Sequence, residues 1–256
     1  MSAVRTTRRG AVLEVTLDRP PANAIDAATS RELGEVFVGA RDDPSIRAAI
    51  VTATGDRFFS AGWDLKAAAA GEVEDDGPGG FAGLTELFDL RTPVIAAVNG
   101  MAVGGGFELA LACDLVVASA GAEFFLPEVG LGFVADAGGV VRLPARLPRA
   151  IAMEMLLTGR RMGAEEAARR GLVNRVVPLA ELLPVARELA AAVADAAPLA
   201  TRAVKAVVDA TEGMTARAAF DAMREVPDYR RMLASEDAKE GPRAFADGRP
   251  PEWTGE

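Results

Sequence analysis

The chain has 256 residues, of which 50% are hydrophobic and 25% are charged, and its formal net charge is −9. This size and apolar content suit one large folded domain and argue against disorder along the whole chain. An acidic balance without a basic stripe also argues against a nucleic-acid-binding protein. Adjacent arginines occur as isolated pairs, among them Arg8 with Arg9, Arg160 with Arg161 and Arg169 with Arg170.

Histidine is absent and cysteine occurs once, at Cys113. A disulfide within the chain and a Ser-His-Asp triad are therefore excluded, and zinc and haem sites are not expected. If the protein catalyses proton transfer, carboxylates are the residues that remain for the task. No stretch has the apolar length of a membrane span and the N-terminus lacks a signal sequence, so we expect a cytoplasmic protein.

The N-terminal part alternates strand and helix patterns. Residues 12–17 have the alternation of a strand, and residues 48–52 are typical of a short buried strand. Between them, Asp26 can cap a helix. The apolar stripe of that helix has helical spacing and consists of Leu33, Val36, Phe37 and Ala40.

The central part contains two loops before its next buried strand. Residues 58–66 indicate a loop that enters a helix, and the acidic, glycine-rich residues 71–80 predict a mobile surface segment. Residues 94–98 are typical of a buried strand, and the Asn-Gly pair at 99–100 predicts a turn after it. The glycine run that follows opens a helix through Ala112.

Two further short strands are expected over 115–118 and 123–125, so the order of strands, loops and helices favours an α/β architecture. From Ala150 onward the pattern becomes almost entirely helical and rich in alanine. This part would pack on the core or on a neighbouring subunit. Its predicted elements are helices over 164–170, 184–196, 199–210 and 215–224 and a strand over 174–177.

Gly104, Gly105 and Gly106 stand where a strand gives way to a helix. Bare backbone N–H groups at a helix start favour negative charge, because the helix dipole is positive there. A tight turn in which the helix approaches a strand closely explains the same glycines equally well. The G-x-G-x-x-G spacing of a dinucleotide site is absent.

Two glutamates stand out near this run. Glu108 lies among apolar residues, where a charge needs a reason, and Glu128 follows a proline. The small residues within 58–66 would let a ligand approach the backbone, and Lys66 adds a cation. Each feature alone is more often a surface, capping or packing residue. Their combination favours proton transfer beside a polarised carbonyl group.

The combined motifs resemble the crotonase, or enoyl-CoA hydratase/isomerase, superfamily over nearly the whole chain. The family implies an α/β fold of the crotonase type, which is a ββα superhelix with a C-terminal helical trimerisation region. Residues 1–196 would then form the core and residues 197–256 the oligomerisation region, in a homotrimer or a dimer of trimers. The segments that carry the resemblance are 59–64, 93–100, 104–110, 126–132, 158–162 and 171–174.

The resemblance also implies roles for individual residues. The backbone N–H groups of Trp63 and Gly105 would form an oxyanion hole for the thioester oxygen, and Glu108 and Glu128 would be the catalytic pair. An acyl-CoA substrate brings its own coenzyme A, so no further cofactor and no metal are expected. The residues that would line the path of the coenzyme A are Ala61, Asp64, Leu65 and Lys66.

The implied reaction is the reversible hydration of an enoyl-CoA. The oxyanion hole would stabilise the enolate, Glu108 would activate water for attack on the β-carbon, and Glu128 would protonate the α-carbon. The presence of both glutamates favours hydration over double-bond migration. A broad enoyl-CoA hydratase, an isomerase, and an acyl-CoA-binding or RNA-binding relative without catalysis stay open, although the acidic charge argues against RNA.

Within the family the chain resembles the subgroup that acts on carnitinyl-CoA, through segments 22–26, 62–69, 79–85, 235–238 and 240–242. Trp63 could then hold a trimethylammonium group by cation–π attraction, or it could simply pack against Phe59 or the loop. Asp136 departs from the glycine of many simple hydratases. It could be a third acid at the pocket, but we expect it to cap the helix that begins at 137–139.

Overall fold

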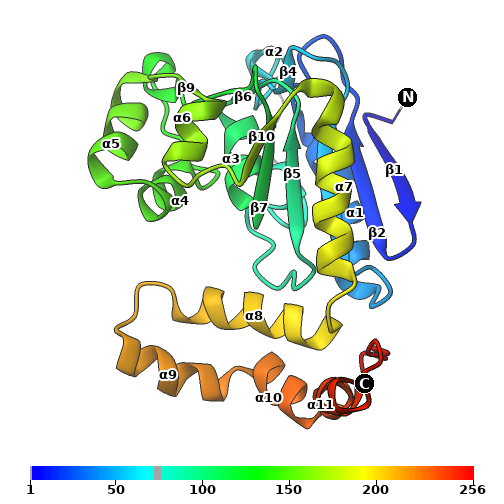
Figure 1. The fold of residues 1–256 in the computed structure, drawn as a ribbon. Coiled ribbons are helices and arrows are strands. Elements are labelled where there is room, and N and C mark those ends of the chain that lie inside the picture. Colours follow the sequence, from blue (N-terminus) through cyan, green and yellow to red (C-terminus); the bar gives the residue numbers. More distant parts are fainter. Residues whose placement is uncertain (1, 72–75) are drawn as a thin grey trace.

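The computed structural model describes residues 2–71 and 76–256 and has a mixed α/β architecture (Figure 1). Its larger sheet has six strands in the order β1–β2–β3–β5–β7–β10. Within this sheet β1 and β2 pair antiparallel, and the other neighbours pair parallel. The bounds are Val4–Arg9 for β1, Val12–Leu17 for β2, Ala48–Ala53 for β3, Val94–Val98 for β5, Leu115–Ser119 for β7 and Arg175–Val177 for β10.

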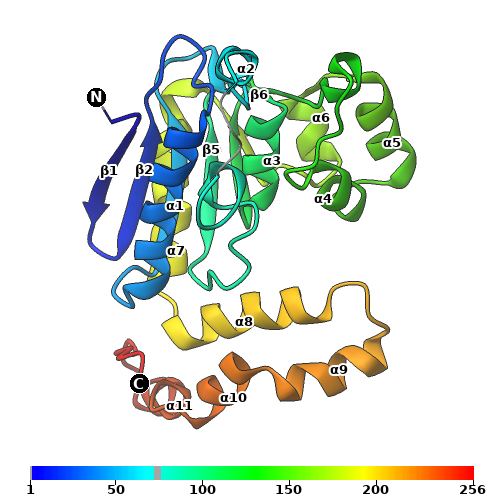
Figure 2. The ribbon, with the colours of Figure 1, turned by 180° about the vertical axis from the view of Figure 1, so that it is seen from behind.

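Helices cover both faces of this sheet, which explains its all-apolar central strands. One face carries α1 (Ala27–Asp42) and the other carries α7 (Leu182–Ala194) (Figures 1 and 2). Every residue of β3 and β5 is buried. On the α7 face, Ile50 and Ile95 belong to one apolar cluster with Leu182. Because a parallel sheet is buried on both faces, its strands carry continuous apolar runs.

A second sheet of four strands, in the order β4–β6–β8–β9, supports the candidate site. Its strands β4, β6 and β8 run parallel, and the antiparallel β9 pairs with β8. The carboxyl ends of parallel strands meet at one edge of a sheet, where ligands of α/β proteins commonly bind. The bounds are Phe58–Ser60 for β4, Met101–Val103 for β6, Glu123–Phe125 for β8 and Met162–Gly163 for β9.

Three motifs from the sequence follow the carboxyl ends of these neighbouring strands. The chain after β4 carries Trp63, and the chain after β6 opens α3 (Gly105–Ala112) with its glycines. The chain after β8 reaches Glu128, the first residue of a 3-10 turn, η2 (Glu128–Leu131). Segments that are far apart in the sequence are thereby brought to one edge of the sheet.

The remaining helices form two groups. The helices α4, α5 and α6 lie beside the second sheet, whereas α8 to α11 form a separate layer at one end of the molecule (Figures 1 and 2). Lys205 of α8 pairs with Asp114 of the core at 2.8 Å. The bounds are Leu65–Ala69 for α2, Gly139–Arg146 for α4, Arg149–Thr158 for α5, Ala164–Arg169 for α6, Pro198–Thr211 for α8, Ala216–Glu225 for α9, Pro227–Ala234 for α10 and Asp237–Asp247 for α11.

The predicted α/β class and most predicted elements are confirmed. Asp26 caps α1, and its carboxylate accepts the Thr29 N–H at 2.8 Å. The sequence pattern missed β1, β4, β6 and β9, which are polar and exposed or very short, and it did not resolve α10 and α11. The first three residues of the predicted loop at 58–66 form β4. β2 does not show a buried and an exposed face, because its Val12 packs in the cluster beneath α7.

The predicted mobile segment at 71–80 is described only in part, since residues 72–75 lie outside the described residues. The remainder packs against α1, where the Ser30 hydroxyl donates to the Asp76 carbonyl at 3.1 Å and to the Gly80 carbonyl at 3.4 Å. Mobility, the division of the chain at residue 196 and the trimeric assembly stay predictions. In the described part of the chain, no helix has the length and apolar character to cross a membrane.

Candidate active site

The loop after β4 leaves one backbone donor unused. Of the four N–H groups from Ala61 to Asp64, three donate hydrogen bonds within the protein, and the one on Trp63 has no acceptor in the described part of the chain. A donor without a partner inside the protein is available to a ligand. The three bonds run from Ala61 to the Ala22 carbonyl at 3.0 Å, from Gly62 to the Ser60 hydroxyl at 3.1 Å and from Asp64 to the Ile25 carbonyl at 2.9 Å.

The start of α3 provides further donors. The N–H groups of Gly105 and Gly106 have no acceptor within residues 2–71 and 76–256, as is usual in the first turn of a helix. A Cβ atom placed on Gly62 would lie only 2.7 Å from the Gly105 nitrogen. The absence of a side chain at Gly62 therefore lets the Trp63 loop contact the start of α3, so that the two sets of unused donors are neighbours.

Glu108, on α3, is only 3% exposed. Its Oε1 accepts a hydrogen bond of 2.7 Å from the N–H of Gly139, the first residue of α4. Burial raises the pKa of Glu108 to about 7, and the charges of Glu128 and Asp136 add to this effect, while the Gly139 hydrogen bond and the Arg142 charge oppose it. A pKa near neutrality suits a group that both accepts and releases a proton.

Glu128 is half-buried, and its Oε2 has no hydrogen-bond partner in the described part of the chain. The other oxygen, Oε1, lies against Gly104, where a Cβ atom would approach it to 2.4 Å. Gly104 also has a φ angle of 53°, so both its backbone and its surroundings require glycine. Burial raises the pKa of Glu128, and the Asp136 charge raises it further.

Two cavities adjoin the carboxylates. Glu128 borders one of about 260 Å³, which is mostly apolar and includes Leu126 and Val134. The other, of about 1,030 Å³, lies between the core and α8 and reaches Asp136. Glu128 therefore borders a mostly apolar cavity on the α5 side, whereas the cavity beside α8 is lined in part by Asp136 and by neither Glu108 nor Glu128.

Asp136 is not the helix cap that the sequence predicted. Gly138 occupies the N-cap position of α4, with a φ angle of 117°, and no side chain caps this helix. Glycine takes such a conformation readily, and its small size leaves the helix start open. The Asp136 carboxylate is exposed, and its negative charge raises the pKa of both glutamates. The structure therefore supports the alternative of a third acid at the site.

Trp63 packs against an aromatic partner that the sequence did not predict. Its ring meets Phe133 edge to face, with the centroids 6.1 Å apart and the planes at 86°. Phe133 is 54% exposed and belongs to the segment between Glu128 and Asp136. An aromatic contact of this kind contributes about 1 kcal/mol.

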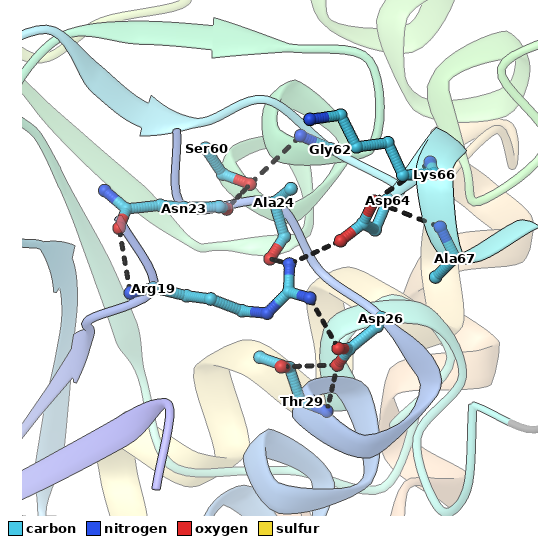
Figure 3. Close-up of polar contacts among 10 residues, drawn as sticks. All are labelled: Arg19, Asn23, Ala24, Asp26, Thr29, Ser60, Gly62, Asp64, Lys66 and Ala67. Carbon is cyan, nitrogen blue, oxygen red and sulfur yellow. Dashed lines mark hydrogen bonds and ion pairs between the residues drawn. The ribbon is translucent and has the colours of Figure 1, made fainter. Parts of the chain in front are cut away.

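The residues predicted to line the coenzyme A path occupy two kinds of position. Leu65 and Lys66 begin α2 and are exposed, as a surface path requires. Asp64 instead turns toward the protein, where its carboxylate caps α2 and pairs with Arg19 at 2.6 Å (Figure 3). Ala61 is half-buried. Contact of these residues with coenzyme A stays a prediction.

Sequence reasoning did not identify Arg19, Phe133 or Gly139 as parts of the site. Arg19 lies 45 positions from its partner Asp64, so no local spacing indicates the pair. Gly139 contributes only a backbone N–H, which no residue pattern specifies. The available signal was the pair Gly138 and Gly139 at the start of α4, because a helix start without side chains can bind an anion through its N–H groups.

Comparison with known proteins identifies the family. Residues 7–256 match the sequence profile of the Enoyl-CoA hydratase/isomerase family. The chain belongs to this family. It is 60% identical to a carnitinyl-CoA dehydratase of Proteus mirabilis, over 99% of this chain and 98% of that protein. It is 59% identical, with the same coverage, to a carnitinyl-CoA dehydratase of Escherichia coli K12.

Solved structures of the family share the fold. The enoyl-CoA hydratase of Mycobacterium tuberculosis H37Rv superposes with a TM-score of 0.92 at 41% identity, and the coverage is 100% of both chains. A carnitinyl-CoA hydratase of Mycobacterium avium superposes with a TM-score of 0.79 at 44% identity, again over 100% of both chains. The expected crotonase fold of this member is therefore confirmed.

Proposed function

We propose that this protein catalyses the reversible dehydration of carnitinyl-CoA to crotonobetainyl-CoA. The proposal rests on one observation. The N–H donors of Trp63 and Gly105, which are not used within the described part of the chain, lie at the same sheet edge as two carboxyl groups of raised pKa, those of Glu108 and Glu128. The relatives named carnitinyl-CoA dehydratase, at about 60% identity over the whole chain, support this acyl group. The reaction class is that of a hydro-lyase.

The two backbone donors act on the thioester. Hydrogen bonds from Trp63 and Gly105 to the thioester oxygen acidify the α-proton, and they strengthen as enolate charge develops on that oxygen. Removal of one such donor in other enzymes costs about 10²–10³ in rate. Because the donors are fixed by the backbone, they need little reorganisation during the reaction.

The glutamates move the protons. In dehydration the Glu128 carboxylate removes the α-proton, and the electron pair passes to the thioester oxygen. The enolate then expels the hydroxyl group from the β-carbon, and Glu108 gives it a proton so that it leaves as water. Hydration runs through the same steps in reverse. Because the pKa of Glu108 is about 7, protonated and ionised forms are both populated near neutral pH.

The trimethylammonium group of the substrate lies one methylene beyond the β-carbon, and so close to the reacting atoms. Trp63 and Phe133 offer aromatic faces there, and Asp136 offers a negative charge near both glutamates. Cation–π attraction contributes on the order of 1–2 kcal/mol. We assign recognition of the cationic acyl group to these three side chains.

The coenzyme A portion would run past Ala61, Asp64, Leu65 and the Lys66 cation, and the reaction needs no other cofactor. We also propose a homotrimer or a dimer of trimers in the cytoplasm. A monomer rarely leaves many large apolar side chains exposed in one region. In the C-terminal layer the exposed ones are Val204, Val208, Met214, Phe220, Leu233 and Phe245. Sedimentation equilibrium of the purified protein tests the assembly, and a monomer at micromolar concentration would contradict it.

The experiment that tests the function compares crotonobetainyl-CoA with crotonyl-CoA, following the loss of the conjugated thioester absorbance. We expect a higher kcat/KM for crotonobetainyl-CoA. Preference for crotonyl-CoA would keep the hydratase mechanism and remove the carnitine assignment. Tight binding of both esters without turnover would overturn the proposal in favour of an isomerase or a binding protein.

A further inference from the structure

Arg19 joins two carboxylates behind the loop that carries Trp63. One guanidinium nitrogen, Nη1, donates to Asp64 Oδ2 at 2.6 Å and to the Ala24 carbonyl at 3.0 Å (Figure 3). The other, Nη2, donates to Asp26 Oδ2 at 2.7 Å. The side chains of Arg19, Asp26 and Asp64 are 30%, 19% and 16% exposed, so the three charges are partly shielded from water.

Each carboxylate also caps a helix through its second oxygen. Asp26 Oδ1 accepts the Thr29 N–H of α1 at 2.8 Å, and Asp64 Oδ1 accepts the Lys66 N–H of α2 at 3.0 Å. Burial raises the pKa of Asp64, but the hydrogen bonds from Arg19 and from α2 outweigh it, so this pKa lies below its ordinary value. Arg19 therefore links the N-cap residues of two helices.

Two backbone hydrogen bonds with Ile25 fix the orientation of the loop that carries Trp63. The Gly62 carbonyl accepts the Ile25 N–H at 2.8 Å, and the Asp64 N–H donates to the Ile25 carbonyl at 2.9 Å. In a trans peptide the C=O and N–H point in opposite directions. The Trp63 N–H therefore points away from Ile25, and this orientation holds only while Gly62 and Asp64 stay in place.

The other end of the loop is anchored without the Arg19 side chain. The Ser60 hydroxyl donates to the Asn23 carbonyl at 2.7 Å and accepts the Gly62 N–H at 3.1 Å (Figure 3). Trp63 thus lies between an anchor at Ser60 and an anchor at Asp64. Asp64 is adjacent to Trp63, and of the hydrogen bonds that its side chain makes with the described residues, only the one to Arg19 reaches outside α2.

We propose that Arg19 is a positioning residue that aims the Trp63 N–H at the thioester oxygen by tying Asp64 to the cap of α1. The inference rests on the proposed oxyanion hole but not on the identity of the acyl group. A solely structural ion pair at this exposure would contribute modestly to stability and would leave the polarisation of a bound carbonyl unchanged.

The test measures the carbonyl stretch of bound butyryl-CoA carrying ¹³C in its thioester carbonyl. This saturated ester cannot be hydrated, and a hydrogen bond to its oxygen lowers the stretching frequency. In Arg19→Gln we expect the frequency to move toward that of the free ester and kcat to fall about tenfold, less than the 10²–10³ for loss of a whole donor. We expect Arg19→Lys to lie between Arg19→Gln and the unchanged protein.

Two further variants make the test specific. Asp64→Asn keeps an acceptor for the cap of α2 but weakens the Arg19 pair, so it should shift the stretch in the same direction, even if Arg19→Gln fails to fold. Arg8→Gln is the matched control, because Arg8 pairs at 2.8 Å with Asp43 at the opposite end of α1. It should leave both kcat and the stretch unchanged.

The outcomes separate this inference from the proposed function. If folded Arg19→Gln shows the same carbonyl stretching frequency as the unchanged protein, the positioning role is overturned. If Arg19→Gln does not fold, the same result in Asp64→Asn overturns it. If the unchanged protein itself does not lower the frequency, the oxyanion hole is absent and both ideas fail. If it prefers crotonyl-CoA, the acyl assignment fails, but the Arg19 result still stands on crotonyl-CoA.

Discussion

Glu108 and Glu128 are the same residue type in two different environments. Glu108 is buried between α3 and α4, where its Oε1 accepts a hydrogen bond from the Gly139 N–H. Glu128 stands at the start of a short 3-10 turn, and its buried Oε2 has no hydrogen-bond partner in the described part of the chain. One environment fixes a carboxyl group, and the other leaves it free to reach a substrate atom. Such differences are how one fold assigns separate acid and base roles.

The largest expected effect separates the two roles. Glu108→Gln and Glu128→Gln should each lower kcat by about 10²–10⁴, the usual contribution of a general acid or base. If Glu128 handles the α-proton, only Glu128→Gln should abolish exchange of the α-protons of butyryl-CoA in D₂O, followed by NMR. Equal loss of exchange in both variants would contradict the separate roles.

The pH dependence of stability measures the burial of Glu108. Its pKa is raised from 4.5 to about 7, so its stabilising contribution is complete below pH 4.5 and is lost as the pH rises through 7. The difference corresponds to about 3 kcal/mol. Because Gln does not ionise, Glu108→Gln should be more stable than the unchanged protein at pH 8, by up to that amount. Urea unfolding at pH 4.5 and 8 measures it, and an equal difference at both pH values would be contrary evidence.

The aromatic side of the site gives a smaller, selective effect. Trp63→Ala should lower kcat/KM for crotonobetainyl-CoA about 5- to 30-fold more than for crotonyl-CoA, in line with the loss of a cation–π contact. Trp63→Phe, which keeps an aromatic face, is the matched control and should retain most of the preference. An equal loss on both esters would show that Trp63 only packs against Phe133.

The smallest expected effect tests how the third acid influences both glutamates. The charge of Asp136 raises the pKa of Glu108 and of Glu128, so Asp136→Asn should lower both. The pH profile of kcat should then move to lower pH, and the preference for the cationic ester should weaken. An unmoved profile with an unchanged ester preference would place Asp136 outside the site.

Local patterns predicted the local structure well. The apolar runs of β3 and β5 identified buried strands, and Asp26 before an apolar stripe identified the cap of α1. The local pattern was wrong at Asp136, which we expected to cap the helix that begins at 137–139. The helix begins two residues later than that expectation requires, with a glycine at its N-cap.

By itself the sequence determined that the protein is an α/β member of this family and that Glu108 is a charge within an apolar run. Only the tertiary structure decided which distant groups meet: the Gly139 N–H at Glu108, Phe133 at Trp63, and Arg19 between Asp26 and Asp64. The physical reason is that side-chain type and spacing set backbone geometry over a few residues. Contacts between segments depend on strand order and on packing across the whole core.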